Sequence, residues 1–255
     1  MAAVLERLRQ HFVGESAPSE DGERRVHFLR PGKTGGTALT ATLLEYRDIA
    51  GYEIVFHGHE TTLADVPVGE RVLFLLRDPV SRFVSAFNGR LREDRPRYHY
   101  PWTEGERRAF ARFKQPEELA SALSSADKTE RAGAEDAMHS IGHISTPYSY
   151  WFNGVRKFRR RQSDLFFIAF QESLDDDFEL LKQRLGLPDE ARLPSDETAA
   201  HRTPASFPRE LSDQARANLE RWYANDIEFV KLCRQLAPTV NALPHLTTPT
   251  SHRRQ

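Results

Sequence analysis

The sequence of 255 residues predicts an α/β fold, a single domain in which a central parallel sheet is flanked by helices. Four short apolar runs indicate buried strands: VHFL (26–29), EIVFHG (53–58), RVLFLL (71–76) and DLFFIAF (164–170). Helical patterns follow several of these runs. Strands that alternate with helices along the chain are typical of a parallel sheet that is buried on both faces.

The chain divides into one folded domain and two flanking regions. Residues 1–24 combine a short helix with most of the polar stretch GESAPSEDGERR, which is typical of a linker. Residues 25–236 contain the four strands and the longer helical patterns. Residues 237–255 predict a flexible tail.

Composition excludes several classes of protein. No apolar run approaches the ~20 residues that span a bilayer, and the N-terminus lacks the apolar core of a signal peptide, so we expect a cytoplasmic protein without a membrane span. The net charge of -1 argues against a general attraction to nucleic acid. Because Cys233 is the single cysteine, an internal disulfide and a cysteine-based zinc site are both excluded.

The first helices are predicted from apolar spacing and from the residues at their ends. TALTATLLEYR (37–47) follows a glycine-rich loop. In segment 78–92 the apolar residues recur on one helical face, with Asp78 as the N-cap and Pro79 at the first helical position.

The second half of the chain predicts three longer helices, at 149–161, 172–186 and 211–236. The helix at 172–186 has acids early, bases late and a terminal glycine, as the helix dipole and C-cap favour. Residues 93–148 are less regular apart from a helix near PEELASAL (116–123). That region is either a substrate-facing insertion or a plain surface excursion.

The stretch FLRPGKTGGT (28–37) joins the first strand to the helix that follows it. Glycines let the backbone approach a ligand, and a strand that leads into a helix points several N–H groups at one anion. Lys33 adds a mobile positive charge, and Thr34 and Thr37 add hydroxyl donors. The pattern predicts a phosphate site; a turn that the glycines only make tight is the alternative.

This loop does not match that of the nucleotide triphosphatases. Gly32, Lys33 and Thr34 supply the second half of that motif, but His27 stands where its first glycine is required. The third strand also lacks an isolated acid for magnesium, since Asp78 is better explained as a helix cap. A divergent P-loop kinase is therefore the weaker alternative.

Two segments resemble the sulfotransferase family. FLRPGKTGGTAL (28–39) is similar to the family's 5′-phosphosulfate loop, especially in the branch of the carbohydrate 2-O-sulfotransferases. LLRDPVSRFVSAF (75–87) resembles the family's 3′-phosphate segment. Weaker likenesses continue through 166–188 and 201–212, so the resemblance covers roughly residues 25–235.

The resemblance implies a P-loop-like sulfotransferase fold for residues 25–236. It also implies 3′-phosphoadenosine-5′-phosphosulfate (PAPS) as donor, 3′,5′-adenosine bisphosphate (PAP) as product, and no requirement for a metal. The residues that it places around the 5′-phosphosulfate are Lys33, Thr34, Gly35, Gly36 and Thr37. Those that it places at the 3′-phosphate are Arg77 and Ser85, with Arg202 as a further phosphate contact.

Some positions depart from the family's pattern or have another explanation. Gly32 stands where the family usually has proline, and Ala38 stands where many relatives carry serine. For Arg77 the alternative is a salt bridge with Asp78 or another acid. We favour the phosphate role, because α/β sheets bind ligands in the crevice at their strand ends and a guanidinium matches the geometry of a phosphate.

The stretch FHGHE (56–60) offers candidates for the base that takes the proton of the acceptor hydroxyl. A similar His-Gly-His in the 2-O-sulfotransferase branch implies a histidine base, and an imidazole with a pKa near ~6.5 suits that role at neutral pH. We expect His59 to be the base, His57 its positioning partner and Glu60 the reserve. A structural histidine or a metal site is the alternative.

The acceptor is the least defined part of this interpretation. The resemblance favours a hydroxyl on a carbohydrate or glycolipid, and it leaves the oligomeric state open. The basic cluster at 156–161 either holds an anionic saccharide or is a solvated helix end. His139 and His143 are candidates for acceptor contacts, and the aromatic residues between 98 and 151 either line a pocket or pack.

A non-catalytic module that binds PAP is the alternative from another functional class. The two histidines beside the anion loop argue against it, because a protein that only binds PAP needs no base there.

Overall fold

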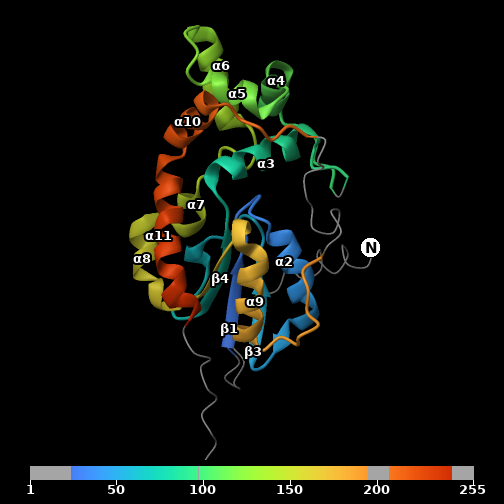
Figure 1. Cartoon of the computed structure of the whole chain (residues 1–255), viewed down its shortest axis with the longest axis vertical. Coiled ribbons are helices and arrows are strands. Elements are labelled where there is room, and N and C mark those ends of the chain that lie inside the picture. Colours follow the sequence, from blue (N-terminus) through green and yellow to red (C-terminus); the bar gives the residue numbers. More distant parts are fainter. Residues whose placement is uncertain (1–23, 97, 195–206, 243–255) are drawn as a thin grey trace, which may run out of the picture.

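A five-stranded sheet forms the centre of the structure, a computed structural model that describes residues 24–96, 98–194 and 207–242 (Figure 1). The strands are β1 (Arg24–Leu29), β2 (Asp48–Ile49), β3 (Tyr52–Phe56), β4 (Arg71–Leu76) and β5 (Leu165–Phe170). Their order is β2-β3-β1-β4-β5, and every neighbouring pair except β2 and β3 is parallel. The predicted α/β class and its four strands are confirmed; the short strand β2 is an addition.

Helices cover both faces of this sheet (Figure 1). The helices on one face are α2 (Gly36–Leu43) and α9 (Leu174–Leu185). Those on the other face are α7 (Tyr148–Phe152), α8 (Gly154–Arg160) and α11 (Ala224–Asn241). Because both faces are buried, β4 and β5 carry continuous apolar runs instead of an alternating pattern.

A third layer of helices lies beyond the carboxyl end of β4 (top of Figure 1). Its helices are α3 (Pro79–Leu91), α4 (Glu104–Arg112), α5 (Pro116–Ala122), α6 (Lys128–Ser140) and α10 (Asp213–Trp222). They share a hydrophobic core that includes Phe83, Phe87, Phe110, Met138 and Leu219. Most of region 93–148 is therefore a packed helical layer with its own core.

Two helices of this layer, α4 and α6, lie in the stretch that the sequence pattern leaves irregular. The buried face of α6 is formed by Ala134, Ala137 and Met138. Alanine is small, so it gives a weak apolar signal although it packs fully. The structure also contains four short 3₁₀ turns in its described part, at Leu44–Tyr46, Leu63–Asp65, Gln162–Asp164 and Gln171–Ser173.

Two predicted helices are each divided in two. The helix expected at 149–161 is interrupted at Asn153 and Gly154, which have φ of 53° and 78° and separate α7 from α8. Asparagine and glycine are the residues that adopt this left-handed conformation most readily. The helix expected at 211–236 is interrupted at Tyr223, whose buried hydroxyl donates to the carbonyl of Ile144 at 3.1 Å.

Helix α11 continues to Asn241, past residue 237, where a flexible tail was expected to begin. The Asn241 side chain is bound to the outer side of β5: its Oδ1 accepts from the Ile168 N–H at 3.0 Å, and its Nδ2 donates to the Ile168 carbonyl at 2.9 Å. The predicted N-terminal helix and Arg202 lie outside the described residues.

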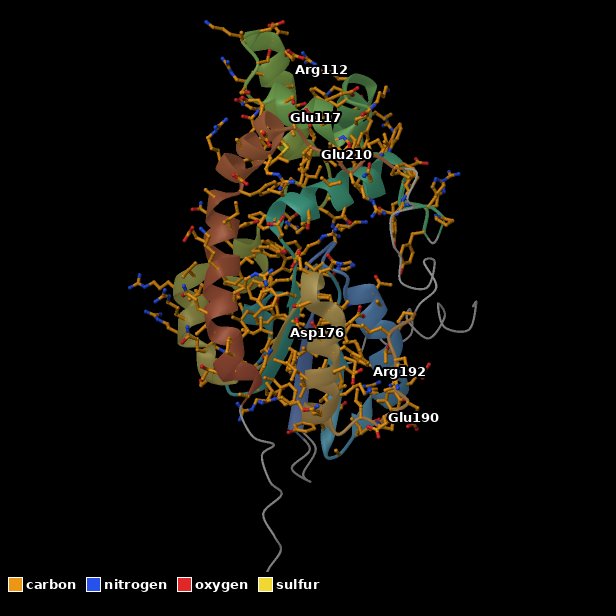
Figure 2. All side chains as sticks on the ribbon, in the orientation of Figure 1. Arg112, Glu117, Asp176, Glu190, Arg192 and Glu210 are labelled. Atoms are coloured by element: carbon orange, nitrogen blue, oxygen red, sulfur yellow. The ribbon has the colours of Figure 1, made fainter. Side chains whose placement is uncertain are left out.

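Charged side chains of both signs cover the outer surface of the molecule (Figure 2). Arg112 and Glu117 lie on the helical layer, Asp176 on α9, and Glu190 and Arg192 at the opposite end of the molecule. This mixture agrees with the net charge of -1. Within the described residues, none of the helices combines the length and apolar character that a membrane span requires.

Candidate active site

The loop between β1 and α2 has a backbone suited to binding an anion. Lys33 and Gly35 lie in the left-handed region, with φ of 67° and 95°, and Gly35 is the N-cap of α2. Among the described residues, no group accepts a hydrogen bond from the backbone N–H groups of residues 33–37. These donors and the positive end of the α2 dipole are therefore available to a single anion.

The two loop threonines have different surroundings. Thr34 is fully buried, and its hydroxyl donates to the Pro31 carbonyl at 2.8 Å, so it closes the loop internally. Thr37 lies half-buried in the first turn of α2, next to the buried Gly36, and its hydroxyl has no partner among the described residues. Of the two hydroxyls, Thr37 is the one free to donate to a ligand.

Gly32 lies in close contact with His143. A Cβ atom at this position would be 2.3 Å from Nδ1 of His143, so a larger residue would force the imidazole to move. The Gly32 carbonyl accepts from Nε of Arg82 at 2.9 Å. This packing gives a steric reason for a glycine at position 32.

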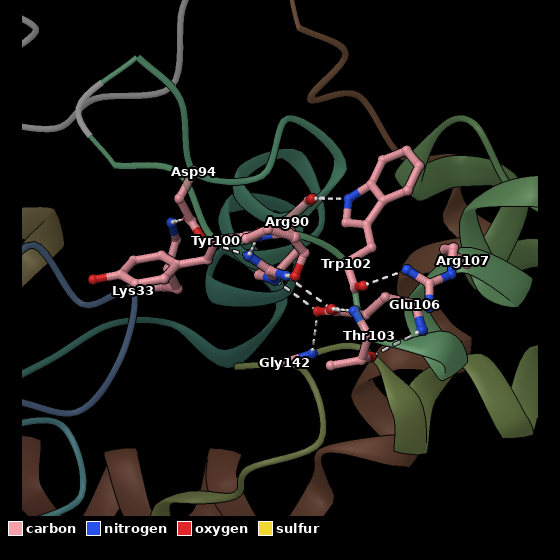
Figure 3. Close-up of polar contacts among 10 residues, drawn as sticks. Lys33, Arg90, Asp94, Tyr100, Trp102, Thr103, Glu106, Arg107 and Gly142 are labelled. Atoms are coloured by element: carbon pink, nitrogen blue, oxygen red, sulfur yellow. Dashed lines mark hydrogen bonds and ion pairs between the residues drawn. The ribbon is translucent and has the colours of Figure 1, made fainter.

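The Lys33 side chain is almost buried and faces a carboxylate. Its Nζ lies 3.2 Å from Oδ1 of Asp94, and the Lys33 side chain is 9% exposed (Figure 3). Burial lowers the pKa of Lys33, and the charge and hydrogen bond of Asp94 oppose that effect. The positive charges of Arg92 and Arg77 lower it further. Lys33 thus lies in a positive field with one carboxylate in contact.

Arg77 follows β4 directly, at the strand end where it was expected. Its backbone N–H donates to the Tyr148 hydroxyl at 3.0 Å, and that hydroxyl donates to the Arg77 carbonyl at 2.8 Å. Its Nε donates to Oγ of Ser81 at 2.9 Å. The alternative role is not seen, because Arg77 forms no ion pair with an acid of the described residues. The Asp78 carboxylate instead caps α3 through the Ser81 N–H at 2.8 Å.

Ser85 lies one helical turn beyond Ser81 on α3. It is half-buried, and its hydroxyl makes no hydrogen bond within the described part of the chain. Burial lowers the pKa of the Arg77 guanidinium, and the charge of Glu172 opposes this. Arg77 therefore directly follows β4, and Ser85 lies on α3, the next helix, with its hydroxyl available to a ligand.

His59 has a defined neutral form. Its Nδ1 lies 2.7 Å from the Arg30 carbonyl, which can only accept, so Nδ1 carries the proton and Nε2 has a free lone pair. The ring is exposed to solvent and stands edge-on to that of His143, with centroids 6.0 Å apart. Desolvation by neighbouring groups lowers the pKa of His59, the hydrogen bond to the Arg30 carbonyl opposes this, and the charges of Arg30 and Lys33 lower it further.

His57 contacts a different set of groups. Its Nε2 lies 2.8 Å from Nδ1 of His27, whose Nε2 is bound to a carboxylate oxygen of Glu70. Since Glu70 accepts, His27 donates through Nε2 and accepts from His57 at Nδ1. Burial lowers the pKa of His57 to about 4, with the charges of His27 and Arg30 adding to this effect.

Strand β3 ends before the His-Gly-His stretch, so the two imidazoles are not held in one extended strand. Arg30, at the end of β1, fixes both residues: its carbonyl accepts from His59, and its Nε donates to the His57 carbonyl at 2.8 Å. Glu60 is exposed and folds over Gly58, where a Cβ would lie 2.2 Å from its Oε1. Of the three candidates, His59 is the one whose ring stands against His143, and His143 packs on Gly32 of the loop.

Two arginines near the loop have no role predicted from the sequence. Arg82 is 2% exposed and donates through Nη2 to the carbonyls of His143 and Thr146, both at 2.9 Å. Together with its bond to Gly32, this fixes the glycine loop to segment 143–146. Nε and Nη1 of Arg92 are buried without a hydrogen-bond partner among the described residues, and the Arg92 Cζ lies over the ring of Phe207, 5.5 Å from its centroid.

The remaining candidates separate into exposed and structural groups. On α8, Arg156, Lys157, Arg159 and Arg160 are exposed, whereas Arg161 donates to the carbonyls of Leu63, Val66 and Pro67 and so holds the fold together. Tyr148 and Trp151 belong to the core, while Tyr100 and Tyr150 are exposed. His139 lies against Trp222, with ring centroids 5.2 Å apart. Among the described residues, no group of three or more His, Cys, Asp or Glu side chains is placed to hold a metal.

Comparison with known proteins gives one family. The model of the Sulfotransferase family matches residues 70–231, which run from the start of β4 into α11 and include Arg77, Ser85 and Asp94. This match covers more than half of the chain, and it begins after the glycine loop. No curated protein matches the sequence significantly.

Proposed function

The chain belongs to the sulfotransferase family, and from this premise we propose that it transfers a sulfuryl group from PAPS to an acceptor hydroxyl. The observation that carries this proposal is that two segments rich in hydrogen-bond donors and positive charge lie at the ends of neighbouring parallel strands. The loop after β1 supplies Lys33 and N–H donors without a partner in the described residues, and β4 leads into Arg77. The carboxyl ends of parallel strands are where α/β sheets bind their ligands.

The residues of both sites fit the two anionic ends of PAPS. The 5′-phosphosulfate would be held by Lys33, by the N–H groups of 33–37 and by the Thr37 hydroxyl, each of which donates. The 3′-phosphate would be held by the Arg77 guanidinium and the Ser85 hydroxyl. The buried and unpartnered nitrogens of Arg92 favour an anion in the same region.

In the proposed reaction the donor supplies the sulfuryl group. A new bond forms between sulfur and the acceptor oxygen, and the bond between sulfur and the bridging oxygen of the phosphate breaks. His59 Nε2 accepts the hydroxyl proton, and Lys33 stabilises the negative charge that develops on the phosphate as PAP leaves. His57 orients the segment that carries His59. Positioning and electrostatics supply most of the acceleration.

For the acceptor we propose a hydroxyl on a carbohydrate or glycolipid. The exposed tyrosines, Tyr100 and Tyr150, offer ring faces to a sugar, and the exposed cations of α8 offer charge to an anionic saccharide. Transfer of radiolabelled sulfate from PAPS onto panels of sugars, phenols and glycolipids would identify the acceptor class.

Binding of PAP tests the donor proposal independently of the acceptor. We expect PAP at saturating concentration to raise the melting temperature, because a ligand that binds only the folded state stabilises it. ATP with magnesium is the comparison, and we expect a smaller shift because its γ-phosphate has no assigned site. A larger shift with ATP and magnesium would favour the kinase alternative, and no shift with PAP would contradict the proposal.

His59→Ala is expected to lower the rate of sulfuryl transfer by about 10²-fold or more. The affinity for PAP should remain unchanged, because His59 is assigned to the acceptor's proton and not to the donor. Turnover and PAP affinity measured on the same preparation separate the two effects. His99→Ala, which alters an exposed histidine beside Glu93, is the control. Wild-type turnover in His59→Ala would exclude this residue as the base.

A further inference from the structure

Lys33 is held by a carboxylate that belongs to the helical layer. Asp94 lies just beyond the end of α3, and its Oδ1 is 3.2 Å from the Lys33 Nζ. Both side chains are almost buried, at 9% exposure for Lys33 and 7% for Asp94. The contact therefore joins the glycine loop to a segment 61 residues further along the chain.

A chain of ionic contacts links Asp94 to Arg90 and Glu106, on the side of Asp94 away from Lys33 in the sequence of contacts (Figure 3). Arg90 Nη1 donates to the other oxygen of Asp94, Oδ2, at 2.9 Å. Arg90 also binds Glu106 on α4 through two hydrogen bonds, of 2.6 and 2.8 Å. Glu106 in turn accepts from the Gly142 N–H at 3.1 Å, next to the His143 that packs on Gly32. The contacts run from the loop through three charged side chains and return to the loop.

The backbone around Asp94 adopts a conformation that side chains disfavour. Glu93 and Asp94 have φ of 55° and 61°, so two consecutive residues other than glycine lie in the left-handed region. Such conformations cost energy and are concentrated at functional sites. The Asp94 N–H is fixed by the Gly89 carbonyl at 2.8 Å. A Cβ at Gly89 would lie 2.4 Å from the Lys33 Nζ, so this glycine makes room for the ion pair.

The charges around Lys33 indicate what Asp94 does: it opposes the effects that lower the pKa of Lys33. The charged and titratable groups that act on Lys33 or respond to it are Asp94, Arg77, Arg92, His59 and His143. Burial and the two arginines lower the pKa of Lys33, and Asp94 is the group that raises it. The ammonium and guanidinium groups around Asp94 outweigh its burial and hold its pKa at about 2, so it is ionised throughout the working range.

We propose that Asp94, held by Arg90 that Glu106 fixes in turn, is a positioning residue that keeps the Lys33 ammonium charged and in place between the glycine loop and the end of α3. The importance of this for turnover rests on the proposed sulfuryl transfer, in which Lys33 must be positive to stabilise the leaving phosphate. Neutralising Asp94 removes the opposing charge, so Lys33 loses its proton at a lower pH. A residue that only stabilises the fold would not have this effect.

The direct test is an NMR titration of Lys33 in protein labelled with ¹³C-lysine, with the resonance assigned through Lys33→Arg. In Asp94→Asn we expect the proton affinity of Lys33 to fall by roughly tenfold or more relative to the wild type. Asp94→Ser, whose smaller side chain leaves space for water, is a second neutral variant with the same expected result. Asp94→Glu, which keeps the charge, should titrate close to the wild type.

Glu93→Gln is the matched control, because it removes a carboxylate from the adjacent residue. Its acid pairs with Arg95 and His99 instead of Lys33, so the Lys33 titration should not move. An unchanged titration in Asp94→Asn or Asp94→Ser, with only a lower melting temperature, overturns the proposal. The titration needs no turnover: a shifted Lys33 in a protein without sulfuryl transfer would retain the positioning role and reject the proposed function.

Discussion

Lys33→Ala is expected to lower the rate of sulfuryl transfer by about 10³-fold. The ammonium is the charged donor in the loop that faces the leaving phosphate, and a neutral methyl group cannot replace it. Because its Nζ contacts Asp94, the substitution also removes a cation bound to that carboxylate. Arg90 remains on Asp94, so the protein should still fold, with a lowered melting temperature.

The measurement is release of PAP at saturating PAPS, with circular dichroism to verify the fold. Lys128→Ala is the matched control, since Lys128 is an exposed lysine at the start of α6, in the helical layer. Its turnover should equal that of the wild type. Activity within threefold of wild type in Lys33→Ala would exclude the assigned role of the loop lysine.

Arg82→Met is expected to lower the free energy of unfolding by about 4 kcal/mol. The guanidinium donates to the carbonyls of Gly32, His143 and Thr146, all at 2.9 Å, and each acceptor would lose a charged donor in a buried place. Methionine preserves most of the apolar stem, but it loses the guanidinium that lies over the rings of Tyr148 and Trp151, with Cζ 5.0 Å from each centroid. The expected loss therefore combines three hydrogen bonds with two cation–π contacts.

Urea unfolding of Arg82→Met measures this loss. The affinity for PAP should fall as well, because Gly32 precedes the anion-binding N–H groups and would no longer be fixed. Arg156→Met, on the exposed side of α8, is the control for removing an arginine. A change below about 1 kcal/mol, the value of a single ordinary hydrogen bond, would show that the neighbouring groups replace Arg82.

The sheet could be predicted from the sequence because its strands are buried on both faces and appear as apolar runs. The same signal cannot locate a break inside a helix. The left-handed backbone at Asn153 interrupts a pattern whose apolar spacing continues on either side, and Tyr223 interrupts α10 and α11 through a hydroxyl that binds the distant Ile144. The break at Tyr223 depends on a tertiary contact, whereas the break at Asn153 uses residue types that tolerate the left-handed region but do not by themselves require it.

The positions of Lys33 and Arg77 could be predicted because each follows a strand of a parallel sheet, where side chains meet at one end. Their partners could not. Asp94 is 61 residues from Lys33, Arg82 is 50 from Gly32, and His27 is 30 from His57. Each of these contacts is formed by folding, and none has a local pattern that marks it. Gly32 is an example: a side chain at this position would collide with the ring of His143, a residue that the local sequence does not bring into view.

β5 is an edge strand of the sheet, and the side-chain amide of Asn241 pairs with the N–H and C=O of Ile168 on its free edge, as a neighbouring strand would. A chain shortened at residue 236 would lose that cover and leave the Ile168 N–H and C=O at this edge of the sheet without it. Unprotected sheet borders recruit strands from other molecules, so this single amide helps to keep separate copies of the protein from associating into aggregates.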